Sequence, residues 1–205
     1  MAPPNGANIT NISGTWVMKL KAHQQGISWI LRKAISVSTA TLKITQGLDE
    51  DGDSPFYKPV EWMVLEPALS GGLQGTPEKR HLNWIKFEHN DTLFGRVVIR
   101  SHYVPGENTA DGRARPLIES FTKVVANPET ESLLTEAVVL PPDVGGVDKM
   151  DKVFIHDSIC SEYHGWAAEQ VWAVEMIGEE SFLTRRVVVW KGSYAEVARV
   201  FYRLA

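Results

Sequence analysis

The sequence predicts an all-β protein built on a ten-stranded antiparallel up-and-down β-barrel. Segments in which apolar and polar residues alternate recur at short spacing, and turn-forming residues separate them, which is the pattern of a strand meander. The connections are mostly tight turns instead of helical crossovers, so neighbouring strands are expected to pair antiparallel. Closing the sheet into a barrel removes the exposed edges that a flat sheet would leave.

Ten segments carry the strand pattern, at 13–21, 39–47, 56–65, 68–75, 80–89, 92–103, 152–161, 166–177, 181–191 and 194–204. Two-residue turns are predicted at Asn90-Asp91, His164-Gly165, Gly178-Glu179 and Gly192-Ser193, where turn-forming residues separate strand segments. No linker divides the chain, so residues 1–205 are expected to form a single domain.

One short amphipathic helix is predicted after the first strand, at about 24–37. The apolar residues of GISWILRKAIS at 26–36 recur at i, i+3, i+4, i+7 and i+8, which is one face of a helix. We expect this helix to be a lid over the barrel mouth, with Trp29 near the rim.

An insertion at about 104–150 interrupts the strand rhythm. Polar Pro/Gly loops occupy both of its ends, and the stretch between them fits helix or strand equally well. Asn127 and Pro128 form a plausible helix start within it, as a cap and a first helical residue. Long structureless loops are uncommon in compact domains, so we expect the insertion to be ordered and to pack on the barrel.

Composition argues against several classes of function. The net charge is −4 without a basic run, so neither nucleic acid nor an anionic membrane surface is indicated as a partner. No segment approaches the roughly 18 apolar residues of a membrane span, and we expect no signal peptide because the N-terminal residues lack an apolar run. Cys160 is the only cysteine, so no internal disulfide can form and a reducing, cytoplasmic location is expected.

Motifs for cofactor or metal chemistry are missing from the sequence. It contains no G-x-S-x-G elbow, no phosphate loop and no G-x-G-x-x-G. The six histidines never pair at metal-ligand spacing. We therefore expect no cofactor and no metal ion.

Gly14-Thr15-Trp16, on the first predicted strand, resembles the G-x-W signature of the calycins, which include lipocalins and fatty-acid-binding proteins. The helical segment that follows, the run GTPEKRHLNW at 75–84 and the close VWKGSYAEVARVFYRLA at 189–205 also resemble fatty-acid-binding proteins in order and spacing. The resemblance implies a barrel of lipocalin or fatty-acid-binding type that holds one small hydrophobic molecule. The chain is also similar to small fungal lipocalin-like proteins, and relatives of this architecture in natural-product pathways act as cofactor-free cyclases or isomerases.

Two features depart from that family. The insertion at 104–150 has no counterpart in typical fatty-acid-binding proteins. The family's terminal R-x-Y, which holds a ligand carboxylate, reads Arg199-Val200-Phe201 here, so the arginine matches and the hydroxyl is missing.

Strand register predicts which side chains share a face with Arg199. A two-residue turn at Gly192-Ser193 places Arg186 opposite Arg199, Thr184 opposite Phe201 and Val188 opposite Val197. If Arg199 points inward, as the resemblance implies, then Arg186 does too. Two guanidiniums in a partly dry cavity need an anion, which is either a protein carboxylate or an acidic ligand group. The alternative places both arginines on the outer, solvated face.

Three more strands contribute predicted interior residues. Gln170 and Trp172 lie on the more apolar face of 166–177. A two-residue turn at His164-Gly165 places Asp157 opposite Trp172 and within reach of Arg186, whereas a three-residue turn would turn His156 inward instead. A turn at Asn90-Asp91 gives an interior set that consists of Leu82, Trp84, Val97, Ile99, Ser101 and Tyr103.

Two functions fit this interior. The titratable candidates for catalysis are Tyr103, Asp157 or His156, Arg186 and Arg199, and the candidates for ligand contact are Trp29, Trp84, Ile99, Gln170, Trp172, Thr184, Val188 and Phe201. The barrel either binds a small hydrophobic molecule, which can carry an acidic oxygen, and promotes its cofactor-independent cyclisation or isomerisation, or it is a passive intracellular carrier of a fatty-acid-like or other hydrophobic ligand. The number of titratable groups favours the enzyme.

Overall fold

The computed structural model describes residues 8–22, 39–50, 58–69, 75–91, 95–119, 128–142 and 147–205. The predicted lid at 24–37, with Trp29, lies outside the described residues and stays a prediction. In the part of the chain that is described, no helix is long and apolar enough to cross a membrane.

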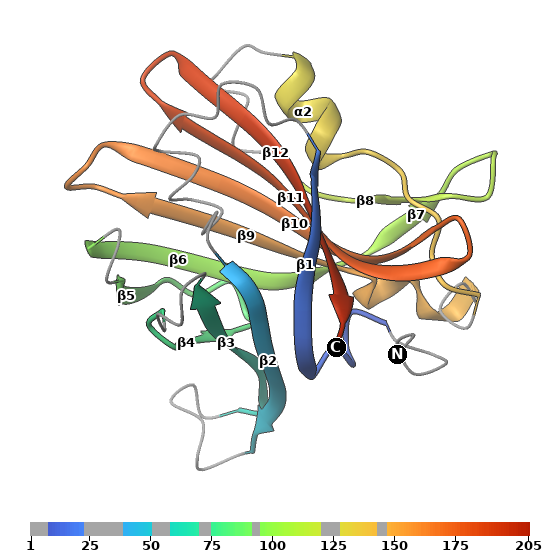
Figure 1. Ribbon diagram of the computed structural model, residues 1–205, viewed down its shortest axis with the longest axis horizontal. Helices are drawn as coiled ribbons and strands as arrows, with labels where there is room; N and C mark the ends of the chain where they lie inside the picture. The colour runs from blue at the N-terminus through green and yellow to red at the C-terminus, as the bar shows by residue number, and fades with distance from the viewer. Residues whose placement is uncertain are drawn as a thin grey trace.

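Ten strands form one antiparallel sheet that curls into a nearly closed barrel (Figure 1). They are β1 (Gly14–Ala22), β2 (Thr39–Asp49), β3 (Val60–Leu69), β4 (Glu78–His81), β5 (Phe87–Asp91), β6 (Gly95–Val104), β9 (Phe154–Ser161), β10 (Trp166–Ile177), β11 (Glu180–Lys191) and β12 (Tyr194–Leu204). Their spatial order is β4-β3-β2-β1-β12-β11-β10-β9-β6-β5, so the first and last strands of the chain pair. The predicted all-β class and the antiparallel barrel with its strand count are confirmed.

The barrel is interrupted between β4 and β5, the two edge strands of the sheet. The segment that joins them crosses to β6 instead, where the backbone N–H of Trp84 donates to the Ser101 carbonyl at 2.8 Å. Trp84 has a φ of 62°, the one positive φ of a non-glycine residue among those described. This left-handed residue lies between β4 and β5, so 80–89 is not one continuous strand, and the prediction of a single strand there is wrong.

A second prediction of strand bounds is also wrong. The segments 56–65 and 68–75 were expected as two strands, but 60–69 is one strand that runs through Pro67. Proline lacks a backbone N–H, which is tolerated where no partner strand needs it. Glu78, the first residue of β4, pairs with Leu65, so Pro67 has no partner residue in β4.

The predicted register of the last hairpin is confirmed. Lys191 pairs with Tyr194, which places Arg186 opposite Arg199 and Thr184 opposite Phe201. The β9–β10 hairpin differs from its prediction because Ser161 pairs with Trp166, which leaves a four-residue loop. Asp157 therefore lies opposite Gln170 instead of Trp172. A shift by an even number of residues keeps every side chain on its predicted face.

The β5–β6 hairpin reverses the predicted face of β5. Asp91 pairs with Gly95, so three residues separate the strands where a two-residue turn at Asn90-Asp91 was expected. His89 consequently pairs with Val97, a residue of the barrel interior. Phe87, His89 and Asp91 thus face inward.

The insertion is ordered where it is described and packs on the outer face of the barrel wall, as expected. It contains both helix and strand: β7 (Gly106–Asn108), β8 (Ala114–Pro116), α2 (Pro128–Leu134) and a 3-10 helix, η2 (Val147–Lys152). Figure 1 shows α2 beside the ends of β11 and β12. Leu134 and Val138 of the insertion join Phe154, Val171 and Val188 in an apolar cluster outside the barrel.

The barrel interior forms a separate and larger apolar core. Trp16, Trp172 and Tyr202 are its largest members, and each is 1% exposed or less. The middle parts of β10 and β11 are therefore buried on both faces.

Candidate functional site

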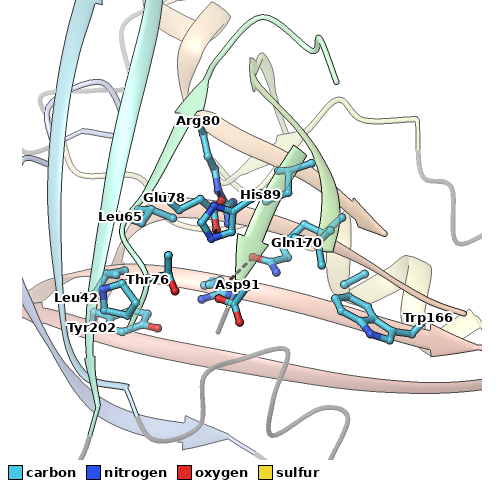
Figure 2. Close-up of a pocket in the computed structure, with 16 residues that line it drawn as sticks. Leu42, Leu65, Thr76, Glu78, Arg80, His89, Asp91, Trp166, Gln170 and Tyr202 are labelled. Carbon is cyan, nitrogen blue, oxygen red and sulfur yellow. Dashed lines mark hydrogen bonds and ion pairs between the residues drawn. The ribbon is translucent and has the colours of Figure 1, made fainter. Parts of the chain in front are cut away.

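A cavity of about 70 Å³ lies inside the barrel (Figure 2). Its apolar lining consists of Leu42, Leu65, Pro67, Val97, Ile99, Ile159, Trp166 and Ala168, and its polar lining consists of Thr76, Glu78, Arg80, His89, Asp91, Gln170, Arg185 and Tyr202. A water molecule takes about 30 Å³ and a drug-sized ligand needs about 300 Å³ or more. The cavity therefore admits a very small molecule, or the end of a larger one.

The cavity opens at the interruption between β4 and β5. Five lining residues are half-buried: Pro67, Thr76, Glu78, His89 and Asp91. They lie at the end of β3, just before and on β4, and on β5, whereas all other lining residues are buried. The two edge strands of the sheet are thus the rims of the opening.

Arg80 is the best-connected polar residue of the cavity. Its side chain is 5% exposed. Its Nη1 donates to Asp157 Oδ2 and its Nε donates to Glu78 Oε1. Trp172 Nε1 donates to the same Asp157 oxygen at 2.7 Å. Burial alone would lower the pKa of Arg80, but the charges of Asp157 and Glu78 raise it above its ordinary value. Arg80 is a fixed cation at the cavity wall.

Arg185 is the second guanidinium of the cavity. Its Nε donates to Gln170 Oε1 at 2.7 Å, and its Cζ lies 4.8 Å from the centre of the Trp172 ring. Beside it, burial raises the pKa of the Tyr202 hydroxyl, and the charge of Arg185 opposes that rise. The Tyr202 hydroxyl is fully buried, and the Arg185 side chain lies within hydrogen-bonding reach of it. Figure 2 shows this hydroxyl directed toward the cavity.

His89 and Glu78 lie on opposite rims of the opening. His89 Nε2 is 4.0 Å from Glu78 Oε2. Figure 2 shows both side chains turned toward Arg80, with Asp91 below them. An imidazole next to a carboxylate at the edge of a cavity can accept and return a proton. Guanidinium N–H groups deeper inside can stabilise an oxygen on which negative charge develops.

The structure corrects the predicted position of both arginines. Arg186 and Arg199 lie on the outer face of the barrel, where the insertion covers them. Arg186 is fully buried, and its Nη1 donates to the carbonyls of Leu133 and Glu136. Burial lowers its pKa to about 10. Arg199 Nη2 forms an ion pair with the Glu136 carboxylate. The anion that this arginine pair needs is a protein carboxylate outside the barrel, so neither the inward nor the solvated alternative holds.

Three predicted ligand contacts share that outer face, because they alternate with interior residues along the strands. Val188 packs in the outer cluster, and Phe201 contacts the ring of Phe182 at a centroid distance of 6.5 Å. Thr184 is buried, and its hydroxyl lies 3.4 Å from the Ala173 carbonyl. None of them lines the cavity.

His156 and Trp84 are also outside the barrel. His156 Nε2 lies 2.8 Å from Glu169 Oε1, and its Nδ1 lies 3.4 Å from His102 Nε2. The Trp84 ring stacks on this pair, 4.2 Å from His102 and 5.1 Å from His156 between centroids. Burial and the charge of His156 lower the pKa of His102 to about 4. This cluster is separated from the cavity by the barrel wall.

Five of the predicted residues are interior. Ile99 and Gln170 line the cavity, while Asp157 and Trp172 lie behind Arg80 and Arg185. Tyr103 also packs against the interior core, but at a different place from the cavity. Its hydroxyl accepts a hydrogen bond from Gln46 Nε2 at 3.2 Å, and burial raises its pKa.

Apart from Gln170, sequence reasoning missed the polar residues that line the cavity: Thr76, Glu78, Arg80, His89, Asp91, Arg185 and Tyr202. Arg185 and Tyr202 are the immediate neighbours of Arg186 and Phe201 in the sequence. The predicted register of the last hairpin was correct, so the opposite choice of inner face would have placed Arg185 and Tyr202 inside the barrel. To predict that His89 and Asp91 face inward, one must know that three residues join β5 to β6, and the residues there do not indicate this loop length.

No group of three or more His, Cys, Asp or Glu side chains within the described ranges is arranged to hold a metal ion. Comparisons of the chain with protein-family models, with curated proteins and with solved structures found no match.

Proposed function

We propose that the protein binds a small hydrophobic molecule in the barrel cavity and promotes its cofactor-independent cyclisation or isomerisation. The observation that carries this proposal is the set of buried polar side chains, Arg80, Gln170 and Arg185, in the cavity wall beside its apolar lining. Burying a charge is unfavourable unless it is paired and hydrogen-bonded. A carrier needs apolar walls and a single anchor, so a larger set of fixed charges favours chemistry.

The proposed reaction divides between the opening and the interior. His89 removes a proton from a carbon next to a carbonyl group and, as an imidazolium, returns it to another carbon, so atoms and electrons balance without a cofactor. Glu78, 4.0 Å away, stabilises the imidazolium. Arg185 and the Tyr202 hydroxyl provide donors for the oxygen that gains charge.

Passive carriage is the second candidate. The guanidinium of Arg80 already donates to two carboxylates, Glu78 and Asp157. A cation that is held this way contributes to the stability of the wall without a substrate. The carrier hypothesis then needs only the apolar lining and Arg185 as an anchor.

Two further expectations stay proposals. The nearly closed barrel agrees with the calycin resemblance of Gly14-Thr15-Trp16, but antiparallel barrels occur in unrelated families, so the fold supports membership without identifying it. The cytoplasmic location rests on Cys160 as the only cysteine of the sequence.

A pair of neighbouring alanines tests ligand binding. Ala168 lines the cavity, whereas Ala167 pairs with Trp190 on the opposite face of β10. We expect Ala168→Phe to abolish saturation-transfer NMR signals from cyclohexanone and 3-cyclohexen-1-one, and Ala167→Phe to keep them, with both variants folded by circular dichroism. Equal binding by both variants would contradict the cavity as the site.

The conversion of 3-cyclohexen-1-one to 2-cyclohexen-1-one then separates the two candidates. Acceleration by the wild-type protein that is lost in His89→Gln supports the isomerase. Binding without acceleration supports the carrier.

A further inference from the structure

Three side chains on the outer face of the barrel form a hydrogen-bonded chain that takes no part in the cavity. The side chains of His156 and Glu169 are 2% and 0% exposed, and His156 Nε2 lies 2.8 Å from Glu169 Oε1. His156 Nδ1 lies 3.4 Å from Nε2 of His102, which is only half-buried. The chain therefore runs from a buried carboxylate through a buried imidazole to an imidazole that solvent reaches.

The carboxylate assigns the protons of this chain. An ionised carboxylate only accepts hydrogen bonds, so the neutral His156 ring places its proton on Nε2, toward Glu169. Nδ1 of His156 is then an acceptor, and His102 donates to it from Nε2. Nδ1 of His102 is thus left with a lone pair. A proton that this nitrogen accepts can be passed on from Nε2 to His156, where Glu169 stabilises the imidazolium.

The surrounding charges agree with this order of proton uptake. Burial and the charge of His156 lower the pKa of His102 to about 4, and Asp157 behind the wall opposes this only in part. On the outer face, the neighbouring charged groups are Glu169 of β10 and Arg100, two residues before His102 on β6. His102 is therefore neutral at neutral pH, and a proton taken up by the pair is held on His156.

Two further hydrogen-bond donors lie next to His102. Asn83 pairs with His102 in an isolated β-bridge, so both side chains point to the same face. Asn83 Oδ1 accepts from the Ile85 N–H at 3.1 Å, whereas Asn83 Nδ2 is buried without a hydrogen-bond partner among the described residues. Arg100 Cζ lies 5.9 Å from the centre of the Trp84 ring, which packs on His102, and no carboxylate of the described residues forms an ion pair with Arg100. Buried donors are nearly always hydrogen-bonded, so the Asn83 amide points to an acceptor that this site binds.

We propose that this outer site hydrolyses small carboxylic esters, with His102 as the general base and with Asn83 and Arg100 as donors to the carbonyl oxygen of the ester. An unprotonated imidazole, a relay that holds its proton and donors without partners are the groups that acyl transfer to water requires. The barrel wall separates this site from the cavity, so the inference does not depend on the function proposed for the cavity.

The reaction balances with water as the only co-reactant. Nδ1 of His102 removes a proton from a water molecule while the water oxygen bonds to the ester carbon, and Nε2 passes a proton to His156. The carbonyl oxygen gains the negative charge, which Arg100 and Asn83 stabilise. The bond to the alcohol oxygen then breaks, and the relay returns the proton to that oxygen.

Hydrolysis of 4-nitrophenyl acetate, followed by the release of 4-nitrophenolate, tests the proposal. We expect the wild-type protein to exceed free imidazole at equal concentration, and His102→Gln to lower the rate about 100-fold, the lower end of what a general base contributes. His164→Gln removes an exposed imidazole from the β9–β10 loop and should leave the rate unchanged. A wild-type rate no higher than that of imidazole, or equal losses in the two variants, overturns the proposal.

Two arginines on the outer face of β6 provide a second variant and its control. Arg100→Gln should lower the rate about tenfold, because one charge-assisted hydrogen bond to the oxyanion is lost. The Arg96 side chain is 70% exposed and pairs with Glu88, so Arg96→Gln should leave the rate unchanged. Both variants should give the circular dichroism spectrum of the wild type. An unchanged rate in Arg100→Gln overturns the assignment of the oxyanion site.

The pH profile tests Glu169 as a positioning residue. The wild-type rate should fall at acid pH as the relay takes up a proton. Glu169→Gln keeps an acceptor for His156 but removes the charge that stabilises the imidazolium, so the fall should move to lower pH. The same acid limb in both proteins overturns the relay. NMR of the histidine ring nitrogens in the wild type needs no variant: above neutral pH we expect a proton on Nε2 of His102, and a proton on Nδ1 overturns its role as the base.

Discussion

Arg185 and Arg186 are neighbours on β11, and both are buried, yet they belong to different parts of the molecule. Arg185 points into the barrel, where it donates to Gln170 beside the cavity. Arg186 points out of the barrel and donates to two backbone carbonyls of the insertion, those of Leu133 and Glu136. One arginine lines a site, and the other attaches a segment of the chain to the barrel wall. Burial of a charge therefore does not identify a functional residue, whereas its partners do.

His156 and Asp157 repeat this contrast on β9. Asp157 points inward and accepts hydrogen bonds from Arg80 and Trp172. His156 points outward and contacts Glu169 at 2.8 Å. The inner residues are connected to the cavity lining, and the outer ones to the covering segment or to one another. Substitutions on the two faces should consequently separate stability from ligand binding.

The largest expected effect is on stability and comes from the outer face. Arg186→Ala removes the donor to two insertion carbonyls and a cation that attracts the buried carboxylate of Glu175. Loss of one partner of a buried charged network costs about 3–5 kcal/mol of the free energy of unfolding. Urea unfolding followed by tryptophan fluorescence measures this. Arg115→Ala, at an exposed arginine of β8, is the control and should change the free energy by less than about 0.5 kcal/mol. An equally small loss in Arg186→Ala would show that the insertion is not attached there.

A substitution on the inner face should lower both the stability of the fold and the affinity for a ligand. Asp157→Asn keeps the shape and an acceptor for Trp172 but removes the charge that faces Arg80. Since Glu78 still pairs with Arg80, the loss should be about 1.5–3 kcal/mol, the contribution of one charge-assisted hydrogen bond. Cyclohexanol affinity should fall as well, because Arg80 lines the cavity. Unfolding and calorimetry on the same preparation test both effects. A stability loss with unchanged affinity would make Asp157 a purely structural residue.

Much of the fold followed from the sequence, and the reason lies in local signals. The bounds of β10 and β12 agree with the predicted 166–177 and 194–204, because turn residues mark both ends of each strand. The register of β11 on β12 followed from the turn at Gly192-Ser193. Gln170 and Trp172 were placed inside correctly. The sequence left Asp157 and His156 open as the inward residue of β9, and the observed even shift of the β9–β10 register turns Asp157 inward.

The sequence did not indicate which face of β11 and β12 points into the barrel, and the reason is physical. Alternation predicts an inner face only when the outer face meets water. Here the insertion covers the outer face, so seven consecutive residues of β11, Leu183 to Val189, are buried and the contrast is lost. The choice of face then depended on the family resemblance of Arg199. The break at Trp84 was equally hidden, because its left-handed backbone is one that sequence patterns assign to glycine, asparagine or aspartate.

A smaller effect, on the pH dependence of the free energy of unfolding, should distinguish the outer face from the inner face. The pKa of His102 is lowered to about 4 from an ordinary 6.5, because burial and the charge of His156 disfavour the imidazolium and Asp157 offsets this only in part. Between these values the unfolded chain binds a proton that the folded chain does not. The contribution of the neutral His102 imidazole to the free energy of unfolding is therefore complete above pH 6.5 and is lost as the pH falls through 4.

The measurement compares unfolding free energies of the wild type and His102→Gln at pH 7 and pH 5. The wild type should lose about 1 kcal/mol more than the variant between these values, allowing for the partial exposure of the imidazole. Cyclohexanol affinity should not follow this transition, since the cluster with Glu169 and Trp84 is on the outer face. The same pH dependence in both proteins would contradict a neutral His102.

The smallest effect is expected at Arg199, the residue that the sequence placed at the centre of the ligand site. Its side chain is 20% exposed, and its partner Glu136 is 42% exposed, so water screens this ion pair, which contributes at most about 1 kcal/mol. Removing the cation also relieves its repulsion of Arg186, whose pKa it lowers. Arg199→Leu should therefore change the free energy of unfolding by less than about 1 kcal/mol and leave cyclohexanol affinity unchanged.

Arg185→Leu is the matched variant on the other face of the same pair of strands, and it should weaken cyclohexanol binding about tenfold through the loss of a charged donor at the cavity. The two variants remove the same charge from neighbouring positions of one wall. If Arg199→Leu weakens binding as much as Arg185→Leu, the faces of β11 and β12 are exchanged, and the site returns to the arginine pair that the sequence first indicated.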